Sequence, residues 1–309
     1  MLKSLKIENF RCFPSFEMQQ LGRLNLIVGT NNSGKTSILE AIKLLLSPSL
    51  NFEVLGDVIV DRSEYIENEE NHTPELVIRH LFYNHQIKIG SKILIAGQDN
   101  LDVKQEIVIS IDNEKIDRNS ESPMLCIKRK TDDLEHMDGG ALECKFALSK
   151  DGNVLLNSLQ NARKSLVEQT SYIEFINSSS LTTEKALDLF EGAVLTPEED
   201  LIIQALQIIE PQIKRIVSLI GKNRYKGTRG SFIVQTPENQ RIPIGSMGDG
   251  MWRMLGIALA WQSLADIANA ENPSEDGITI HRIEKGKQNS IVFTERQIAI
   301  AAERHIEVR

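Results

Sequence analysis

The order of apolar and polar positions at the start of the chain predicts a strand pair, a buried strand and a helix. Residues Leu2–Ile7 and Phe13–Met18 both alternate with a period of two, so we expect them to pair as a hairpin. The run Leu24–Val28 is mostly apolar, which is typical of a strand buried on both faces of a parallel sheet. Apolar residues then recur at helical spacing over 38–45, and Pro48 is expected to end that helix.

The remaining pattern divides the chain into an acidic excursion, a β-rich section and a helical section. Residues 49–75 are polar and acidic, and we interpret them as exposed, with a short strand or turn at Val58–Val60. Alternating runs over 75–147 indicate antiparallel strands. Downstream, the pattern predicts helices over 181–191 and 197–209, strands over 213–220 and 231–236, a turn into a helix over 244–261, a hairpin over 278–293 and a helix over 294–304.

The segment between the apolar strand and the first helix carries the candidate chemistry. Residues 29–36 read GTNNSGKT and match the phosphate-binding pattern GxxxxGK[ST]. Glycines let the backbone curl around a phosphate, and loop N–H groups with the helix N-terminus attract anions. We expect Lys35 to reach the β- and γ-phosphates of ATP and Thr36 to ligate Mg²⁺. The predicted nucleotide-binding residues are Gly29, Thr30, Asn31, Asn32, Ser33, Gly34, Lys35, Thr36 and Ser37.

The string LKIENFRCF…LNLIVGTNNSGKTSILEAIKLLL resembles the opening of ABC-type ATPases of the RecF/SMC/OLD branch, which often carry the label "AAA family ATPase". The resemblance implies an α/β P-loop NTPase fold, like an ABC-ATPase head, with an antiparallel β subdomain. It implies one ABC-type domain over 1–309, with a P-loop lobe at 1–48, a β-rich insert at 75–150 and a helical, signature-motif lobe with the C-terminal tail at 181–309. It also places Arg11 near adenine and ribose; the alternative is a solvated charge at a strand end.

A second resemblance lies in the segment IGSMGDGMWRMLGIALA, which looks like the signature motif of the same family. Ser246, Gly248 and Gly250 match its serine and glycines, and Asp249 lies between them. In the family this element reaches the γ-phosphate bound to the other subunit, so the resemblance implies an ATP-dependent homodimer. A serine and glycines before a helix also suit phosphate binding on physical grounds. The alternative is an ordinary helix start with glycine turns.

The sequence departs from the family after Ala260. An apolar strand ending in Asp-Glu (Walker B), a D-loop and a switch histidine are expected there, and no such motif follows in the sequence. We interpret this as an internal deletion with its joint near Ala260–Trp261, which would leave the central sheet incomplete. His281 is interpreted as an exposed strand residue rather than a switch histidine.

Three alternatives for function follow from this departure. The chain is an ATPase that dimerises on ATP and regulates a separate effector chain, a nucleotide-binding module without hydrolysis, or a non-functional remnant of a deletion. Hydrolysis is the step in doubt, because loss of a general base typically lowers a rate by ~10²–10⁴-fold.

Composition narrows the list of partners. The 309-residue chain has a net charge of −8, so any nucleic-acid contact needs a local basic patch, such as the loop Lys222–Arg229 or the run Lys128–Lys130. Such runs are more often simply solvated. The three cysteines have no paired spacing and are predicted to be free thiols of a cytoplasmic protein, and no apolar stretch is long enough for a membrane span.

Overall fold

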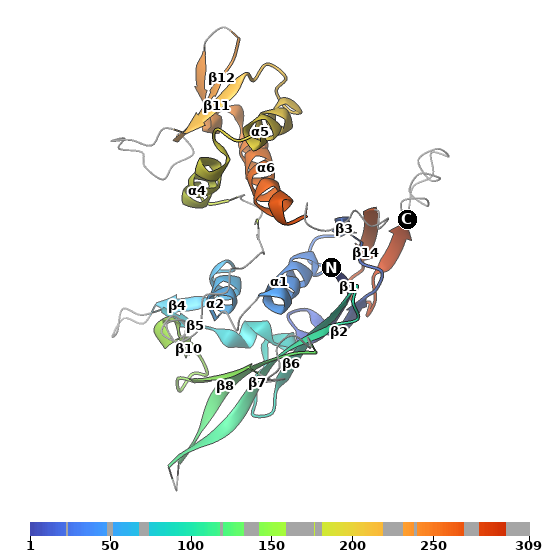
Figure 1. Cartoon of the computed structure of the whole chain (residues 1–309). Coiled ribbons are helices and arrows are strands. Elements are labelled where there is room, and N and C mark those ends of the chain that lie inside the picture. The colour runs from blue at the N-terminus through green and yellow to red at the C-terminus, as the bar shows by residue number, and fades with distance from the viewer. Residues whose placement is uncertain are drawn as a thin grey trace. The chain divides into compact units, whose positions relative to one another are not determined.

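The computed structural model describes residues 1–22, 24–47, 52–67, 74–117, 120–132, 142–158, 176, 181–218, 231–237, 240–268 and 278–294. The chain forms two compact units (Figure 1): Met1–Ile173 with Glu275–Arg309, and Glu174–Ser274. The lobe expected over 181–309 is thus divided between the units, and its C-terminal hairpin belongs with the phosphate-binding loop. No helix among the described residues has the length and apolarity that a membrane span requires.

The first unit is built on a six-stranded antiparallel sheet in the order β2-β1-β6-β7-β8-β9. The predicted hairpin is confirmed, because Leu5 pairs with Met18 and Ile7 with Phe16. The strands predicted over 75–147 are confirmed as well. The strands of this sheet are β1 (Leu2–Phe10), β2 (Phe13–Met18), β6 (Lys92–Asp99), β7 (Lys104–Asp117), β8 (Ser120–Thr131) and β9 (Leu142–Ala147).

A second sheet of this unit holds the strand that leads into the phosphate-binding loop. Its order is β15-β14-β3, with β3 (Leu24–Gly29) parallel to β14 (Ile278–Ile283) and β14 antiparallel to β15 (Ile291–Thr294). The predicted C-terminal hairpin is confirmed. The expectation that β3 is buried on both faces is wrong, because Leu24 and Leu26 are each 52% exposed. Among the described strands β3 stands at the sheet edge.

Helix α1 (Lys35–Leu46) packs on the antiparallel sheet, and α2 (Phe52–Val60) packs beside α1 (Figure 1). Buried residues from both helices join one core with the sheet, including Ile38, Leu45 and Ile59. The expected exposed strand or turn at Val58–Val60 is therefore wrong, because Leu55, Val58 and Ile59 face this core as one stripe of a helix. Short elements complete the unit: β4 (Tyr65–Glu67), β5 (Pro74–Leu76), β10 (Val154–Leu155), and the 3₁₀ turns η1 (Ile78–Leu81) and η2 (Tyr83–His85).

Within its described residues, the second unit packs three helices with a small antiparallel sheet. Phe190, Phe232 and Trp252 meet at its centre with ring centroids 5.5 and 5.8 Å apart. The helices and strands predicted here are confirmed. They are α4 (Thr183–Ala193), α5 (Glu198–Gln207), β11 (Arg215–Ser218), β12 (Phe232–Gln235), β13 (Arg241–Pro243), η4 (Ile244–Met247) and α6 (Asp249–Ala268). The basic loop Lys222–Arg229 and the helix predicted after Thr294 lie outside the described residues.

Candidate nucleotide site

The phosphate-binding loop runs from the end of β3 into the first turn of α1, as the sequence predicts. Two of its residues have left-handed backbone, Asn32 at φ 60° and Gly34 at φ 100°. Gly34 is the N-cap of α1, and the first turn carries no acidic residue. Because the first N–H groups of a helix have no intrahelical acceptor, this end of α1 is open to an anion.

The two motif glycines are required by protein packing. A Cβ on Gly29 would collide with the carbonyl oxygen of Ile283, and one on Gly34 would collide with the Phe13 ring and the Cys12 sulfur. The sequence analysis predicts that these glycines let the backbone curl around a phosphate, which stays a prediction; the structure adds close contacts with neighbouring segments of the protein. Both glycines therefore fix how closely the loop approaches β14 and the β1–β2 turn.

The polar side chains of the loop differ in what they contact. The Lys35 ammonium donates to the carbonyl oxygens of Gly29 and Thr30, at 2.9 and 2.8 Å. The Ser33 hydroxyl is buried, and no polar atom of the described residues bonds it. Thr36 is exposed. Ser37 is buried, and its hydroxyl accepts from Arg62 Nη2 at 3.2 Å.

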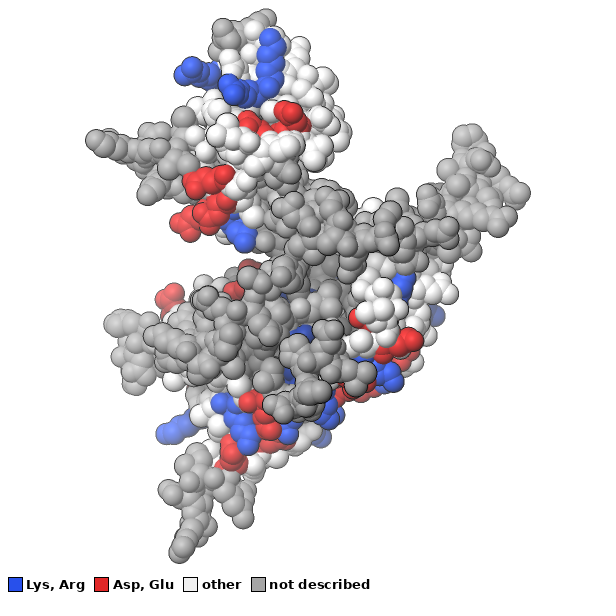
Figure 2. All heavy atoms as spheres, in the orientation of Figure 1, with Lys and Arg blue, Asp and Glu red and all other residues white. Residues whose placement is uncertain are grey.

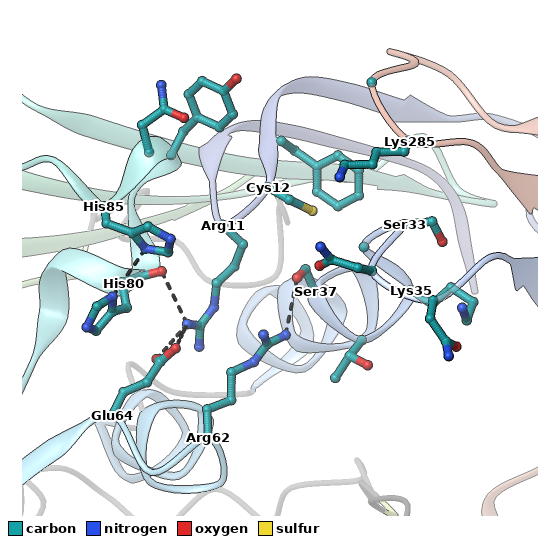
Figure 3. Close-up of a pocket in the computed structure, with 18 residues that line it drawn as sticks. Arg11, Cys12, Ser33, Lys35, Ser37, Arg62, Glu64, His80, His85 and Lys285 are labelled. Carbon is teal, nitrogen blue, oxygen red and sulfur yellow. Dashed lines mark hydrogen bonds and ion pairs between the residues drawn. The ribbon is translucent and has the colours of Figure 1, made fainter.

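These side chains line a pocket of about 800 Å³ (Figure 3), which is within the range of small-molecule sites. One wall is the loop 31–37. The opposite wall comes from η1, η2 and the β1–β2 turn. Lys285 and Gly286 of the β14–β15 turn also line it. The site thus combines segments that are distant in the sequence. Burial raises the pKa of the Cys12 thiol, which lies in the same pocket.

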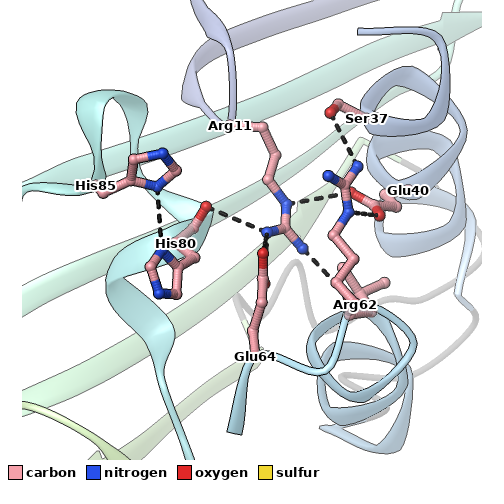
Figure 4. Close-up of polar contacts among 8 residues, drawn as sticks. Arg11, Ser37, Glu40, Arg62, Glu64, His80 and His85 are labelled. Carbon is pink, nitrogen blue, oxygen red and sulfur yellow. Dashed lines mark hydrogen bonds and ion pairs between the residues drawn. The ribbon is translucent and has the colours of Figure 1, made fainter. Parts of the chain in front are cut away.

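Arg11 occupies the wall between the loop and η1 (Figure 4). Its side chain is 4% exposed and bonds Glu40 at 3.2 Å and Glu64 at 2.5 Å. It also donates to the carbonyl oxygens of His80 and Val58. The alternative of a solvated strand-end charge is therefore wrong. Arg11 ties β1 to α1, α2 and η1, and its expected contact with adenine and ribose stays a prediction.

Several pocket residues carry no motif and were missed by sequence reasoning. Arg62 bonds Glu40 at 2.6 Å and Ser37 at 3.2 Å, so it connects the residue after α2 to the loop helix. His80 and His85 face each other with their Nδ1 atoms 3.2 Å apart. Arg62 and Glu40 are 22 residues apart in the sequence, so their contact depends on tertiary packing, and no motif in the sequence indicates either pair.

His281 differs from its sequence interpretation. It is fully buried rather than exposed, with Nδ1 3.3 Å from Ser290 Oγ and Nε2 3.3 Å from Asn25 Oδ1. Burial lowers its pKa. The alternation of Ile278–Ile283 assigned the wrong face to the solvent, because it cannot tell which side of a strand packs inward.

The segment that resembles the signature motif lies at the start of α6 in the second unit. Ser246, Gly248, Asp249 and Gly250 are all exposed. Gly248 has a left-handed backbone at φ 91°, which favours glycine. A Cβ on Gly250 would meet no atom within 4 Å. The described part of the chain therefore gives no packing reason for glycine at position 250.

The basic run Lys128–Lys130 lies on β8 among carboxylates. Lys128 pairs with Glu143 at 3.4 Å, and Lys145 of the adjacent strand β9 pairs with Glu114 at 2.8 Å. Figure 2 shows cations and anions mixed over this part of the molecule. This arrangement favours the solvated interpretation of the run over a nucleic-acid patch.

Comparison with known protein families identifies the family of this chain. The model of the AAA ATPase domain matches residues 1–186. The chain belongs to the AAA ATPase domain family. The resemblance seen in the sequence and the α/β P-loop fold class are thereby confirmed, while the internal deletion stays a prediction.

Individual relatives differ in their sequence identity to this AAA ATPase domain protein and in how much of the chain they match. It is 24% identical over 323 residues to an "ATP/GTP phosphatase" of Helicobacter pylori, covering 95% of this chain and 81% of that protein. It is 48% identical over 63 residues to an "OLD nuclease" of Thermus scotoductus, covering 19% of this chain and 12% of that protein. A solved structure of the recombination mediator RecF with ATP is 13% identical at a TM-score of 0.41, covering 94% of this chain and 97% of that one.

Proposed function

We propose that the protein binds ATP with Mg²⁺ at the loop Gly29–Thr36. The observation that carries the proposal is the buried Ser33 hydroxyl, which no described residue bonds. A buried polar group without a partner costs about 1–3 kcal/mol, so a ligand that bonds it is favoured. Ser33 is one of the residues that line the pocket, together with Lys35 and the open end of α1.

Each residue of the loop has a role in this proposal. Lys35 exchanges its two carbonyl acceptors for β- and γ-phosphate oxygens, which are stronger acceptors because they are charged. The exposed Thr36 hydroxyl would hold Mg²⁺, which supplies charge neutralisation between the phosphates. Ser37 and Arg62 hold the first turn of α1 in place for both contacts.

Calorimetric titration of the full chain with ATP-Mg tests the proposal. Lys35→Ala removes the ammonium and is expected to weaken binding by ~10-fold or more, as charge-assisted hydrogen bonds contribute ~1.5–3 kcal/mol. Lys43→Ala is the matched control, since Lys43 lies on the same helix and does not line the pocket. Equal affinity in both variants, or no binding by the unaltered chain, would contradict the proposal.

We further propose that ATP brings two copies together through Ser246–Gly250 and that this dimer regulates a separate effector chain. The exposed start of α6 supports the dimer, because glycine in a helix is unfavourable relative to alanine. No described packing within the chain explains that cost at Gly250. Close approach of a second copy with its bound triphosphate would explain it.

Binding without hydrolysis is the second candidate function, and one observation favours it. Among the described residues that line the pocket, Glu64 is the one carboxylate. Arg11 already bonds both oxygens of Glu64, so Glu64 is poorly placed to position a water for attack. Phosphate release from ATP that is abolished by Lys35→Ala would reject this candidate. ATP binding without such release would support it.

A further inference from the structure

We infer that the β14–β15 turn is part of the nucleotide site and that Lys285 supplies it with a second ammonium group. The inference rests on the proposed binding of ATP at the loop. Sequence reasoning assigned no role to this turn. With this turn, the nucleotide site includes a second segment of the chain in addition to the phosphate-binding motif.

Strand register places this turn beside the loop. β14 is parallel to β3, and Ile283, its last residue, pairs with Gly29, the last residue of β3. The two strands therefore end at the same edge of the sheet, where ligands bind in α/β folds. The Ile283 carbonyl lies so close to Gly29 that no side chain fits between them. The start of the turn is thus fixed against the start of the loop.

Turn geometry then presents Lys285 at the corner. The N–H of Lys287 donates to the Glu284 carbonyl at 3.2 Å, which closes a β-turn with Lys285 and Gly286 in the central positions. Gly286 has φ 79°, as the third residue of a type II turn requires. Lys285 and Gly286 line the pocket together with the loop, and Lys287 does not. Figure 3 shows the Lys285 side chain among the residues that line the pocket.

The charge of Lys285 is available to a ligand. The side chain is exposed and makes no ion pair with any residue that the structure describes, while the neighbouring Glu284 pairs with Arg282 at 3.5 Å. The cations Arg11 and Arg62 on the other wall are held by Glu40 and Glu64. Among the lysines and arginines that line the pocket, Lys35 and Lys285 therefore remain to balance a triphosphate, one from the motif and one from the β14–β15 turn.

Titration of the full chain with ATP-Mg and with AMP tests the inference. Lys285→Ala is expected to weaken ATP-Mg binding by about 10-fold, the size of one charge-assisted contact, and to change AMP binding less. Lys287→Ala, in the same turn but outside the pocket, is expected to bind within about two-fold of the unaltered chain. Lys285→Arg keeps the charge and should restore most of the affinity.

Salt dependence gives a readout that a purely structural role would not move. Loss of an ammonium–phosphate contact should make ATP-Mg affinity of Lys285→Ala less sensitive to salt than that of Lys287→Ala. Equal affinity and equal salt dependence in these two variants would overturn the inference, even when binding still requires Lys35. If the unaltered chain binds no ATP-Mg, both the proposed function and the inference are wrong.

Discussion

At the scale of single residues, the pocket depends on a buried ionic group rather than on the motif alone. Arg11 donates to two carboxylates and two carbonyl oxygens, and these acceptors come from α1, α2, η1 and the segment before β4. Buried ion pairs add little net stability when complete, yet removal of one partner leaves an uncompensated charge. Arg11 is therefore expected to matter for folding as well as for the shape of the site.

Arg11→Met is expected to lower the free energy of unfolding by about 3 kcal/mol or more, because Glu64 would lose its partner. Urea unfolding followed by circular dichroism measures the loss. Arg79→Met, at an exposed site on η1, is the control and should change the midpoint little. Equal midpoints for the two variants would show that the buried group is not needed for stability.

His281 predicts a pH dependence of stability with a definite sign. Burial lowers its pKa below the 6.5 of the unfolded chain, so the folded state binds fewer protons. The contribution of neutral His281 to stability is therefore fully present above pH 6.5. It is lost as the pH falls below that value towards and through the folded pKa. His281→Asn should reduce the fall in stability between pH 7.5 and pH 5.5, measured by urea midpoints. An unchanged fall in His281→Asn would show that another group sets the pH dependence.

At the scale of elements, one substitution in helix α6 is expected to affect stability and dimerisation in different ways. Gly250→Ala should leave the thermal midpoint unchanged or slightly higher, because alanine favours a helix by roughly 0.5–1 kcal/mol and meets no atom here. The same methyl group should weaken ATP-dependent dimerisation, measured by analytical ultracentrifugation. A dimer of unchanged affinity would reject the role proposed for this segment.

Element prediction from the sequence succeeded where one local signal decided the outcome. The alternation of β1 and β2, the strand–loop–helix order around Lys35 and the C-terminal hairpin are all local. It failed at α2, because Gly56 and Asp57 are weak helix formers and hide the helical stripe of Leu55, Val58 and Ile59. It also failed for β3 and His281, since the buried face of a strand depends on neighbours that the local sequence does not reveal.

At the scale of the whole molecule, the chain has two units with separate cores. Both tryptophans, at positions 252 and 261, belong to the second unit, while the proposed ATP site belongs to the first. The two units can therefore be followed separately in one sample. This division also gives a test of the alternative that the chain is a non-functional remnant.

Saturating ATP-Mg is expected to raise the calorimetric midpoint of the first unit by several degrees, since a ligand at 100 times its Kd adds about 2.7 kcal/mol. At protein concentrations too low for dimers, tryptophan fluorescence should report an unchanged midpoint for the second unit. A Lys35→Ala sample serves as the control. Melting without cooperativity, unaffected by ATP-Mg, would favour the remnant.

The parallel pairing of β14 with β3 has a consequence for biosynthesis. Residues 24–29 leave the ribosome long before residues 278–283, yet the two strands share one ladder, and the first motif glycine lies against the last carbonyl of the later strand. A nascent chain therefore carries a loop without its neighbouring strand until β14 emerges. Premature termination before β14 would release a polypeptide that contains the whole phosphate-binding motif but lacks the strand against which its first glycine packs.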